Sequence, residues 1–404
     1  MATPLLEKNI LLGVTGSIAA YKAAELASRL AQGGAEVDVI LTQAACQFIL
    51  PLTFQSVTGR RAYLDADLWG SEGHVQHIGL ANNADLLVIA PASANTLAKM
   101  ACGIADNLLT LAALAARCPI LLAPAMDGGM FSHPATQANL ETLRRRGAAI
   151  IGPAEGHLAS GLTGVGRMVE PGELLAHIVL ALAKDGPLAG SKVVVTAGGT
   201  QEPIDPVRVI MNRSSGKQGT AVAQAALERG ARVVLISGPT SLPGPIGVDF
   251  TEVRTAGEMQ EAVLQEVVDA DALIMAAAVA DFRPVTAAGE KIKREKGLQQ
   301  IILEPTADIL AAVAEMKTHT GYPRVLVGFA AESQDLVNNA RQKLQSKQLD
   351  LIVANDITAL DAGFAVDTNR VTILDAGGGV EVLPLMSKAE VAAVLIERII
   401  GLLS

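Results

Sequence analysis

Residues 9–32 read NILLGVTGSIAAYKAAELASRLAQ, and this stretch decides the fold class. It begins with an apolar strand, Asn9–Val14, which runs into the turn Thr15–Ser17 and then into an amphipathic helix. Gly33-Gly34 stops that helix, and a second apolar strand follows over Glu36–Leu41. A strand, a helix and a second strand in this order predict a parallel sheet covered by helices.

The same alternation continues and later restarts. In the first half we predict strands over 85–90 and 119–123 and a helical stretch over 94–116 that breaks near Gly103. A cluster of helix breakers, Lys184–Pro187, precedes a new apolar strand over Lys192–Val195 and the turn Thr196–Thr200. The later elements are strands over 231–236, 272–276, 324–327 and 350–353, an edge strand over 371–374, a helix over 219–229 and a closing helix over 389–403.

We therefore predict two tandem doubly wound, Rossmann-like parallel-sheet domains, over residues 1–188 and 189–404. The 404 residues carry 41 acidic and 32 basic side chains, a net charge of −9, which disfavours a general nucleic-acid binder. No apolar run approaches the roughly 18–20 residues of a membrane helix, and no signal peptide is evident. The three cysteines lack C-x-x-C spacing, which disfavours zinc or a disulfide framework and favours the cytoplasm.

Two turns in the first half have the composition of ligand-binding loops. The turn Thr15–Ser17 opens a helix, where backbone N–H groups favour a phosphate; the alternative is an ordinary capped turn. The loop Pro91–Thr96 follows a buried strand and carries three polar donors, Ser93, Asn95 and Thr96, of which a helix cap explains only one. The fingerprint G-x-G-x-x-G is absent, which disfavours a tandem NAD dehydrogenase.

Three further features of this half have a chemical and a structural interpretation. His77 is either a general base or a structural histidine. Asp127 lies beside two glycines, where it either binds a substrate or caps the next element. The Gly-rich segment Gly156–Arg167 is either a lid over a site or a solvated loop.

In the second half, three basic segments could bind an anion. Asn212–Lys217 resembles a phosphate loop without being a Walker A motif. The charged run Lys291–Lys296 is either solvated surface or a triphosphate contact. Lys343 and Lys347 are four residues apart, so they share one helix face, where an anion between them would relieve their repulsion.

Together, these segments resemble the family of bifunctional coenzyme A biosynthesis proteins across nearly the whole chain. The matching segments of the first half are GVTGSIAAYKA, HIGLANNADLLVIAPASANTLAKMACGIADNLL, PAM-x-x-x-M and GLTGVGRM. Those of the second half are VTAGGTQEPIDPVRVIMNRSSGKQG, SGPTSLP, AAAVADFRP, EKIKR, VGFAAES and LDLIVAND. Their order and spacing make the resemblance specific, although single motifs would not be.

For the first half, the resemblance implies a flavodoxin-like, homo-oligomeric cysteine decarboxylase fold that acts on phosphopantothenoylcysteine. It implies that His77 is catalytic. It also implies that FMN oxidises the substrate thiol, which creates an electron sink for loss of carbon dioxide. The residues expected to bind FMN are Gly16, Ser17, Thr42, Ser93, Asn95 and Thr96.

For the second half, the resemblance implies a phosphopantothenate–cysteine ligase that uses CTP and Mg²⁺. The substrate carboxylate would form an acyl-cytidylate, from which cysteine displaces CMP. Lys291 matches the activating lysine, and Asn212 matches an asparagine that handles the acyl-cytidylate. The other expected CTP contacts are Met275, Ala276, Ala277, Asp281, Thr306, Ala307, Asp308, Ile309, Phe329, Lys343 and Lys347.

Three positions depart from the family pattern. Asp127 stands where many members have Asn, and Ala307 where they often have Pro. Ser160 stands where a lid Cys donates the final proton, and its hydroxyl is a far weaker acid than a thiol. Either His157 or a water serves instead, or the decarboxylase is altered or lost, or the first half regulates a partner. The family also implies trimer-based decarboxylase assemblies and ligase dimers.

Overall fold

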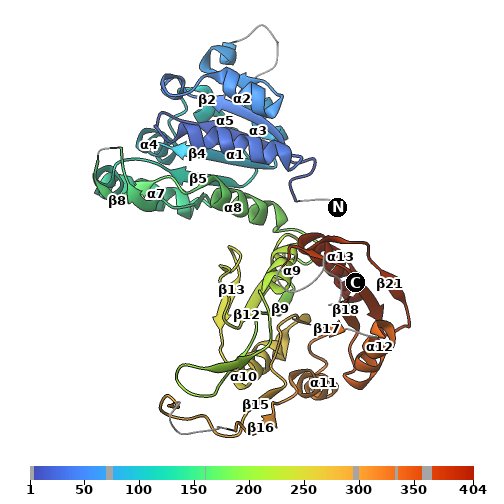
Figure 1. The fold of residues 1–404 in the computed structure, drawn as a ribbon. Coiled ribbons are helices and arrows are strands. Elements are labelled where there is room, and N and C mark those ends of the chain that lie inside the picture. Colours follow the sequence, from blue (N-terminus) through green and yellow to red (C-terminus); the bar gives the residue numbers. More distant parts are fainter. Residues whose placement is uncertain (1–3, 70–75, 160, 294–299, 333–334, 357–365) are drawn as a thin grey trace. The chain divides into compact units, whose positions relative to one another are not determined.

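The computed structural model describes residues 4–69, 76–159, 161–293, 300–332, 335–356 and 366–404. The chain divides into two compact units, Ala2–Ala183 and Lys184–Ser404. Each unit has its own main sheet with helices on both faces (Figure 1). The prediction of two α/β domains built on parallel sheets is thereby confirmed.

The sheet of the first unit has six strands, all parallel, in the order β3-β2-β1-β4-β5-β6. Its strands are β1 (Asn9–Val14), β2 (Glu36–Leu41), β3 (Ala62–Tyr63), β4 (Leu86–Ala92), β5 (Ile120–Pro124) and β6 (Ala149–Ile150). β1 pairs with β2 on one side and β4 on the other. The strand order therefore reverses beside β1, and such a reversal opens a crevice at the carboxyl ends of the strands.

Two helical layers cover this sheet because the central strands are apolar on both faces. One layer comprises α1 (Ala20–Gln32), α2 (Pro51–Thr58) and α8 (Pro171–Ala183). The other comprises α3 (Gln76–Asn83), α4 (Ala94–Cys102), α5 (Leu108–Ala115) and α7 (Pro134–Arg145). A short helix α6 (Gly128–Ser132) and an antiparallel hairpin, β7 (Ala154–His157) and β8 (Thr163–Arg167), complete the unit.

The main sheet of the second unit has eight strands in the order β13-β12-β9-β14-β17-β18-β20-β21. They are β9 (Lys192–Ala197), β12 (Arg232–Ser237), β13 (Asp249–Glu252), β14 (Ala272–Met275), β17 (Val325–Glu332), β18 (Leu351–Asp356), β20 (Val371–Asp375) and β21 (Val380–Val382). The predicted edge position of 371–374 is wrong, because β20 lies between β18 and β21 and pairs antiparallel with both. The exposed β21, with the sequence Val-Glu-Val, forms the edge instead.

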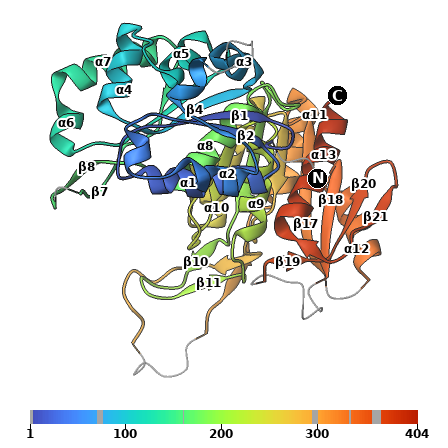
Figure 2. The same ribbon diagram turned by 90° about the horizontal axis from the view of Figure 1, so that it is seen from above.

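Helices α10 (Ala256–Glu266), α11 (Ile309–Thr320) and α12 (Leu336–Ser346) share one apolar core with this sheet. Helices α9 (Lys217–Leu227) and α13 (Lys388–Leu403) pack against each other. The smaller strand pairs are β10 (Gln201–Pro203) with β11 (Val209–Met211), β15 (Phe282–Pro284) with β16 (Leu303–Pro305), and β19 (Thr368–Asn369) with β22 (Met386–Ser387). The β10–β11 hairpin lies at one end of the unit (Figure 2).

Among the residues that the structure describes, no helix has both the length and the apolar character needed to cross a membrane.

Candidate functional sites

The first unit contains a cavity of about 1010 Å³. Its walls are the segments that follow β1, β2, β4 and β5, so it lies at the carboxyl ends of the strands, beside the reversal of strand order. The polar and ionisable side chains that line it include Ser17, Lys22, Thr42, Ser93, Asn95, Thr96, Asp106, Asn107, Asp127, His157 and Arg167.

The buried Thr15 joins two walls of this cavity. Its Oγ1 donates to the Pro91 carbonyl at 2.7 Å and accepts the Ser93 N–H at 2.9 Å. Ser93 in turn caps α4 by accepting the Thr96 N–H at 3.4 Å. A Cβ on Gly16 would lie 2.6 Å from the Ala44 Cβ, so only glycine lets the two walls approach this closely. The result is a turn that brings the half-buried hydroxyls of Ser17 and Ser93 to the cavity wall, which suits a phosphorylated cofactor.

The β7–β8 hairpin is fastened to the cavity wall at its base. The Met126 N–H donates to the Gly166 carbonyl at 3.0 Å, and a Cβ on Gly166 would lie only 2.3 Å from the Met126 carbonyl oxygen. Lys22 is 3% exposed, and its Nζ donates to the Met168 carbonyl at 2.8 Å and to Glu170 Oε1 at 3.0 Å. The hydrogen bond that Lys22 donates to Glu170 is the main reason that the pKa of Glu170 lies below its usual range.

The structure places all six residues expected to bind the flavin, and the predicted site residue Asp127, around this cavity. Gly16, Ser17, Thr42, Ser93, Asn95, Thr96 and Asp127 all line it. His77 does not line it; it lies on α3, where its buried Nδ1 has no hydrogen-bond partner among the described residues. Ser160 lies outside the described residues. Sequence reasoning missed Lys22, although it lies within the segment GVTGSIAAYKA.

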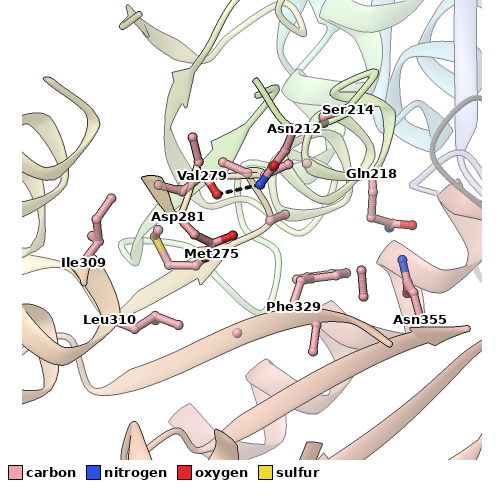
Figure 3. A pocket seen from close by; sticks show the side chains of 18 of the residues that line it. Asn212, Ser214, Gln218, Met275, Val279, Asp281, Ile309, Leu310, Phe329 and Asn355 are labelled. Carbon is pink, nitrogen blue, oxygen red and sulfur yellow. Dashed lines mark hydrogen bonds between the residues drawn. The ribbon is translucent and has the colours of Figure 1, made fainter. Parts of the chain in front are cut away.

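The second unit contains a cavity of about 750 Å³ (Figure 3). It is bounded by the N-terminus of α9, the segment after β14, the start of α11 and parts of β17 and β18. Here too the strand order reverses, because β9 lies between β12 and β14. The residues expected to contact CTP that line this cavity are Met275, Ala276, Ala277, Asp281, Thr306, Ala307, Asp308, Ile309, Phe329, Lys343 and Lys347, together with Asn212.

Buried threonines hold the segment after β14 in place. Thr196 Oγ1 accepts the Ala277 N–H at 3.1 Å, and Thr200 Oγ1 accepts the Ala280 N–H at 2.8 Å. The Asn212 Nδ2 donates to the Val279 carbonyl at 2.8 Å, as Figure 3 shows. The amide of Asn212 is therefore oriented by the same wall of the cavity that carries Met275–Asp281.

One wall of this cavity combines a helix cap with an ion pair. Asp308 Oδ1 accepts the Ala311 N–H at 3.0 Å and so caps α11, while Oδ2 pairs with the Lys347 ammonium. Burial opposes ionisation of Asp308, but the hydrogen bonds from Lys347 and Ala311 outweigh it and hold its pKa below the usual range. Lys347 is thereby oriented at the cavity wall.

Another wall contains polar residues that sequence reasoning missed. Lys388 is 6% exposed, and its Nζ donates to the Val366 carbonyl at 2.6 Å. Burial, with a smaller contribution from the nearby Lys217, lowers the pKa of Lys388. The Asn355 Oδ1 is buried and has no hydrogen-bond partner within the described ranges. The segment LDLIVAND already contained Asn355, whereas nothing in the sequence marked Lys388.

Lys291 is exposed and is not among the residues that line this cavity. Its backbone neighbour Ile292 is held by the turn between β10 and β11: the Ile292 N–H donates to Asp205 Oδ2 at 3.2 Å, and its carbonyl accepts from Arg208 Nη2 at 2.9 Å. No group of three or more His, Cys, Asp or Glu side chains that could hold a metal occurs in the part of the chain that the structure describes.

Comparisons with known proteins agree with this two-part organisation. The flavoprotein family model matches residues 2–183, and the model described as "DNA/pantothenate metabolism flavoprotein C-terminal domain" matches residues 188–402. The coenzyme A biosynthesis bifunctional protein CoaBC of Bacillus subtilis (strain 168) is 46% identical over 398 residues, which cover 98% of this chain and 97% of the relative.

Two further similarities concern parts of the chain. A cysteine/cysteine sulfinic acid decarboxylase of an unknown prokaryotic organism is 48% identical over 331 residues, covering 81% of this chain and 91% of the relative. The crystal structure of the C-terminal domain of a CoaBC protein is 40% identical, with a TM-score of 0.46, and covers 54% of this chain and 98% of that one. The nearly complete match at 46% identity decides the assignment: the chain belongs to the family of coenzyme A biosynthesis bifunctional proteins.

Proposed function

We propose that this chain catalyses two consecutive reactions of coenzyme A biosynthesis. The second unit joins cysteine to phosphopantothenate at the expense of CTP, and the first unit decarboxylates the product, phosphopantothenoylcysteine, to phosphopantetheine with FMN. One observation carries the proposal. Each unit has a large cavity with polar side chains among its lining residues at the strand-order reversal of its own sheet, in a chain that matches a bifunctional relative along 98% of its length.

In the ligase reaction, a carboxylate oxygen of phosphopantothenate attacks the α-phosphorus of CTP. A new P–O bond forms, the bond to the β-phosphate breaks, and pyrophosphate leaves. The cysteine amine then attacks the acyl carbon and releases CMP. Lys291, which is exposed and does not line the cavity in this structure, would offset the negative charge on the phosphate once its side chain extends to the bound substrate. Asn212, whose amide is fixed by the Val279 carbonyl, orients the acyl-cytidylate for the attack.

Mg²⁺ is expected to enter this cavity with CTP. Asp281 and Asp308 are carboxylates among the lining residues, and the described residues contain no preformed metal cluster. An ion held mainly by substrate phosphates and one or two carboxylates fits this arrangement, because Mg²⁺ is usually bound in this way.

In the first unit, Ser17, Thr42, Ser93, Asn95 and Thr96 would hold FMN, since their hydroxyl and amide groups line the cavity and Gly16 lets its wall pack closely against Ala44. Bound FMN would supply the oxidation of the substrate thiol and the return of the electrons after loss of carbon dioxide. The N–H of Gly129 holds the Asp127 carboxylate at 2.9 Å, which places a hydrogen-bond acceptor for the substrate amide at the cavity wall.

Two proton-transfer groups remain to be placed. His157 lines the first cavity and is the candidate donor for the final reduction in place of the lid cysteine. His77 does not line this cavity, so its proposed role requires a second copy of the chain to complete the site. We therefore propose a homo-oligomer, with trimer-based decarboxylase units and ligase dimers, that works in the cytoplasm.

The alternative is an active ligase fused to a flavin unit with a changed reaction. The reason to test this alternative is the similarity, over 81% of this chain, to a relative described as a cysteine/cysteine sulfinic acid decarboxylase. The two half-reactions separate the possibilities. With phosphopantothenate, CTP and Mg²⁺ but no cysteine, we expect pyrophosphate release from the ligase unit. With synthetic phosphopantothenoylcysteine alone, we expect carbon dioxide; free cysteine as the better substrate would favour the alternative.

A further inference from the structure

Asp205 is a buried carboxylate in the turn that joins β10 and β11, and none of the proposed chemistry uses it. Its side chain is fully shielded from solvent, while that of its ion-pair partner Arg208 is 50% exposed. Burying an ionised carboxylate is costly unless its oxygens are hydrogen-bonded, so the partners of Asp205 indicate what it is for.

The two oxygens of Asp205 have different partners. Oδ1 accepts the N–H groups of Val207 and Arg208, both at 2.9 Å, and so shapes the turn itself. Oδ2 accepts from the Arg208 guanidinium and, at 3.2 Å, from the backbone N–H of Ile292, which lies 87 residues along the chain. The second oxygen therefore connects the turn to the segment that carries Lys291.

Two further bonds complete this connection. Arg208 Nη2 donates to the Ile292 carbonyl at 2.9 Å, and the Ala288 N–H donates to the Ile204 carbonyl at 2.9 Å. The segment is thus held on both sides of Lys291, whose side chain is exposed between the two attachments. The Arg208 hydrogen bonds hold the pKa of Asp205 well below its usual range, so the attachment stays charged near neutral pH.

We propose that Asp205 is a positioning residue for the ligase reaction: through the Ile292 N–H, it fixes the backbone from which Lys291 reaches the transferring phosphate. The inference rests on the proposed role of Lys291. An ionised carboxylate fits this task better than an amide. In an asparagine, Oδ1 could still accept the two N–H groups of the turn, but Nδ2 is a donor and would face the donors of Arg208 and Ile292.

The test is a double-mutant cycle on steady-state pyrophosphate release from CTP, with phosphopantothenate, cysteine and Mg²⁺ at saturating concentrations. The variants are Asp205→Asn, Lys291→Gln and both together. The matched control is Asp249→Asn, because Asp249 forms an exposed ion pair with Arg232 in the same unit. Since misplacing a catalytic group by about 1 Å can cost 100-fold, we expect Asp205→Asn to lower kcat about 10- to 100-fold, with KM for CTP within about twofold.

Additivity separates positioning from general damage. We expect the double variant to be no slower than Lys291→Gln alone and the control to match the parent chain. If Asp205→Asn lowers kcat by its full factor in the Lys291→Gln background as well, or leaves kcat unchanged while Lys291→Gln is slow, the inference is wrong. If Lys291→Gln itself is as fast as the parent, the proposed role of Lys291 fails first. If Asp205→Asn does not fold, Arg208→Lys replaces it in the same cycle. That substitution removes the guanidinium group that donates to the Ile292 carbonyl.

Discussion

Replacing Gly219 by alanine tests whether the close packing of α9 on β9 builds the nucleotide cavity. Gly219 lies in the first turns of α9 and lines the cavity. A Cβ at this position would lie 2.7 Å from both the Thr196 carbonyl oxygen and the Ala197 Cβ, and 2.9 Å from the Ala197 Cα. These neighbours belong to the central strand β9, so they cannot move aside without disturbing the sheet.

The magnitude follows from the overlap. Carbon atoms pack at about 3.5–4.0 Å, so α9 would have to retreat from β9 by roughly 0.8 Å or more. Overpacking of this kind costs about 1–3 kcal/mol. Alanine also favours a helix interior over glycine by roughly 0.5–1 kcal/mol, which partly conceals the loss. Gly401→Ala in α13 is the matched control, because nothing lies within 4 Å of the methyl group that this substitution would add.

Thermal unfolding of the two variants isolates the packing effect, since both gain similar helix propensity. A unit of this size loses about 2–4 °C in Tm for each kcal/mol, so Gly219→Ala should melt about 2–12 °C below Gly401→Ala. CTP affinity should fall in Gly219→Ala only, because the displaced N-terminus of α9 carries the Ser214–Gly219 wall of the cavity. Equal melting temperatures and equal CTP affinities would refute this account of the cavity.

Three further predictions concern the base of the β7–β8 hairpin, a buried lysine and acid stability. Gly166→Ala should weaken flavin binding about 5- to 150-fold, measured by flavin fluorescence titration, because overpacking against the Met126 carbonyl costs about 1–3 kcal/mol; unchanged affinity would contradict it. Lys22→Met leaves the buried Met168 carbonyl without its lysine donor, so the temperature of flavin release should fall, by an amount corresponding to about 1–3 kcal/mol; an unchanged release temperature would show that this bond is dispensable. Because hydrogen bonds from Arg208 lower the folded-state pKa of Asp205, its stabilisation is complete above the unfolded pKa of about 3.9 and is lost as the pH falls through the lower folded value. Urea unfolding should therefore show a constant stability gap between the parent chain and Asp205→Asn from pH 7 to pH 5, and a shrinking gap below about pH 4; a gap that shrinks between pH 7 and pH 5 would argue against the lowered pKa.

Much of the fold could be predicted because buried parallel strands are apolar along their whole length. The strand Asn9–Val14 was predicted with the bounds of β1, and the helical break near Gly103 separates α4 from α5. The predicted edge position of the strand over 371–374 is wrong. This strand, β20, lies between β18 and β21, and its pairing with β21 cannot be recognised from the sequence.

The cavities could be predicted where one continuous segment forms a wall, as with Ser93–Thr96 and Met275–Ala277. Single residues brought in from distant helices could not. Lys388 reaches the second cavity from α13 and Lys22 reaches the first from α1, and each looks like an ordinary helix lysine in the sequence. Tertiary packing alone buries them.

The most direct test of the central claim is a mass-spectrometric time course on the purified full chain. It would receive phosphopantothenate, cysteine, CTP and Mg²⁺. We predict CTP-dependent formation of phosphopantothenoylcysteine, followed by phosphopantetheine, which is lighter by one carbon dioxide. Accumulation of the ligated product alone, or of a species two hydrogens short of phosphopantetheine, would confine the claim to the ligase and place the failure in the first unit. The absence of any CTP-dependent product would contradict the account as a whole.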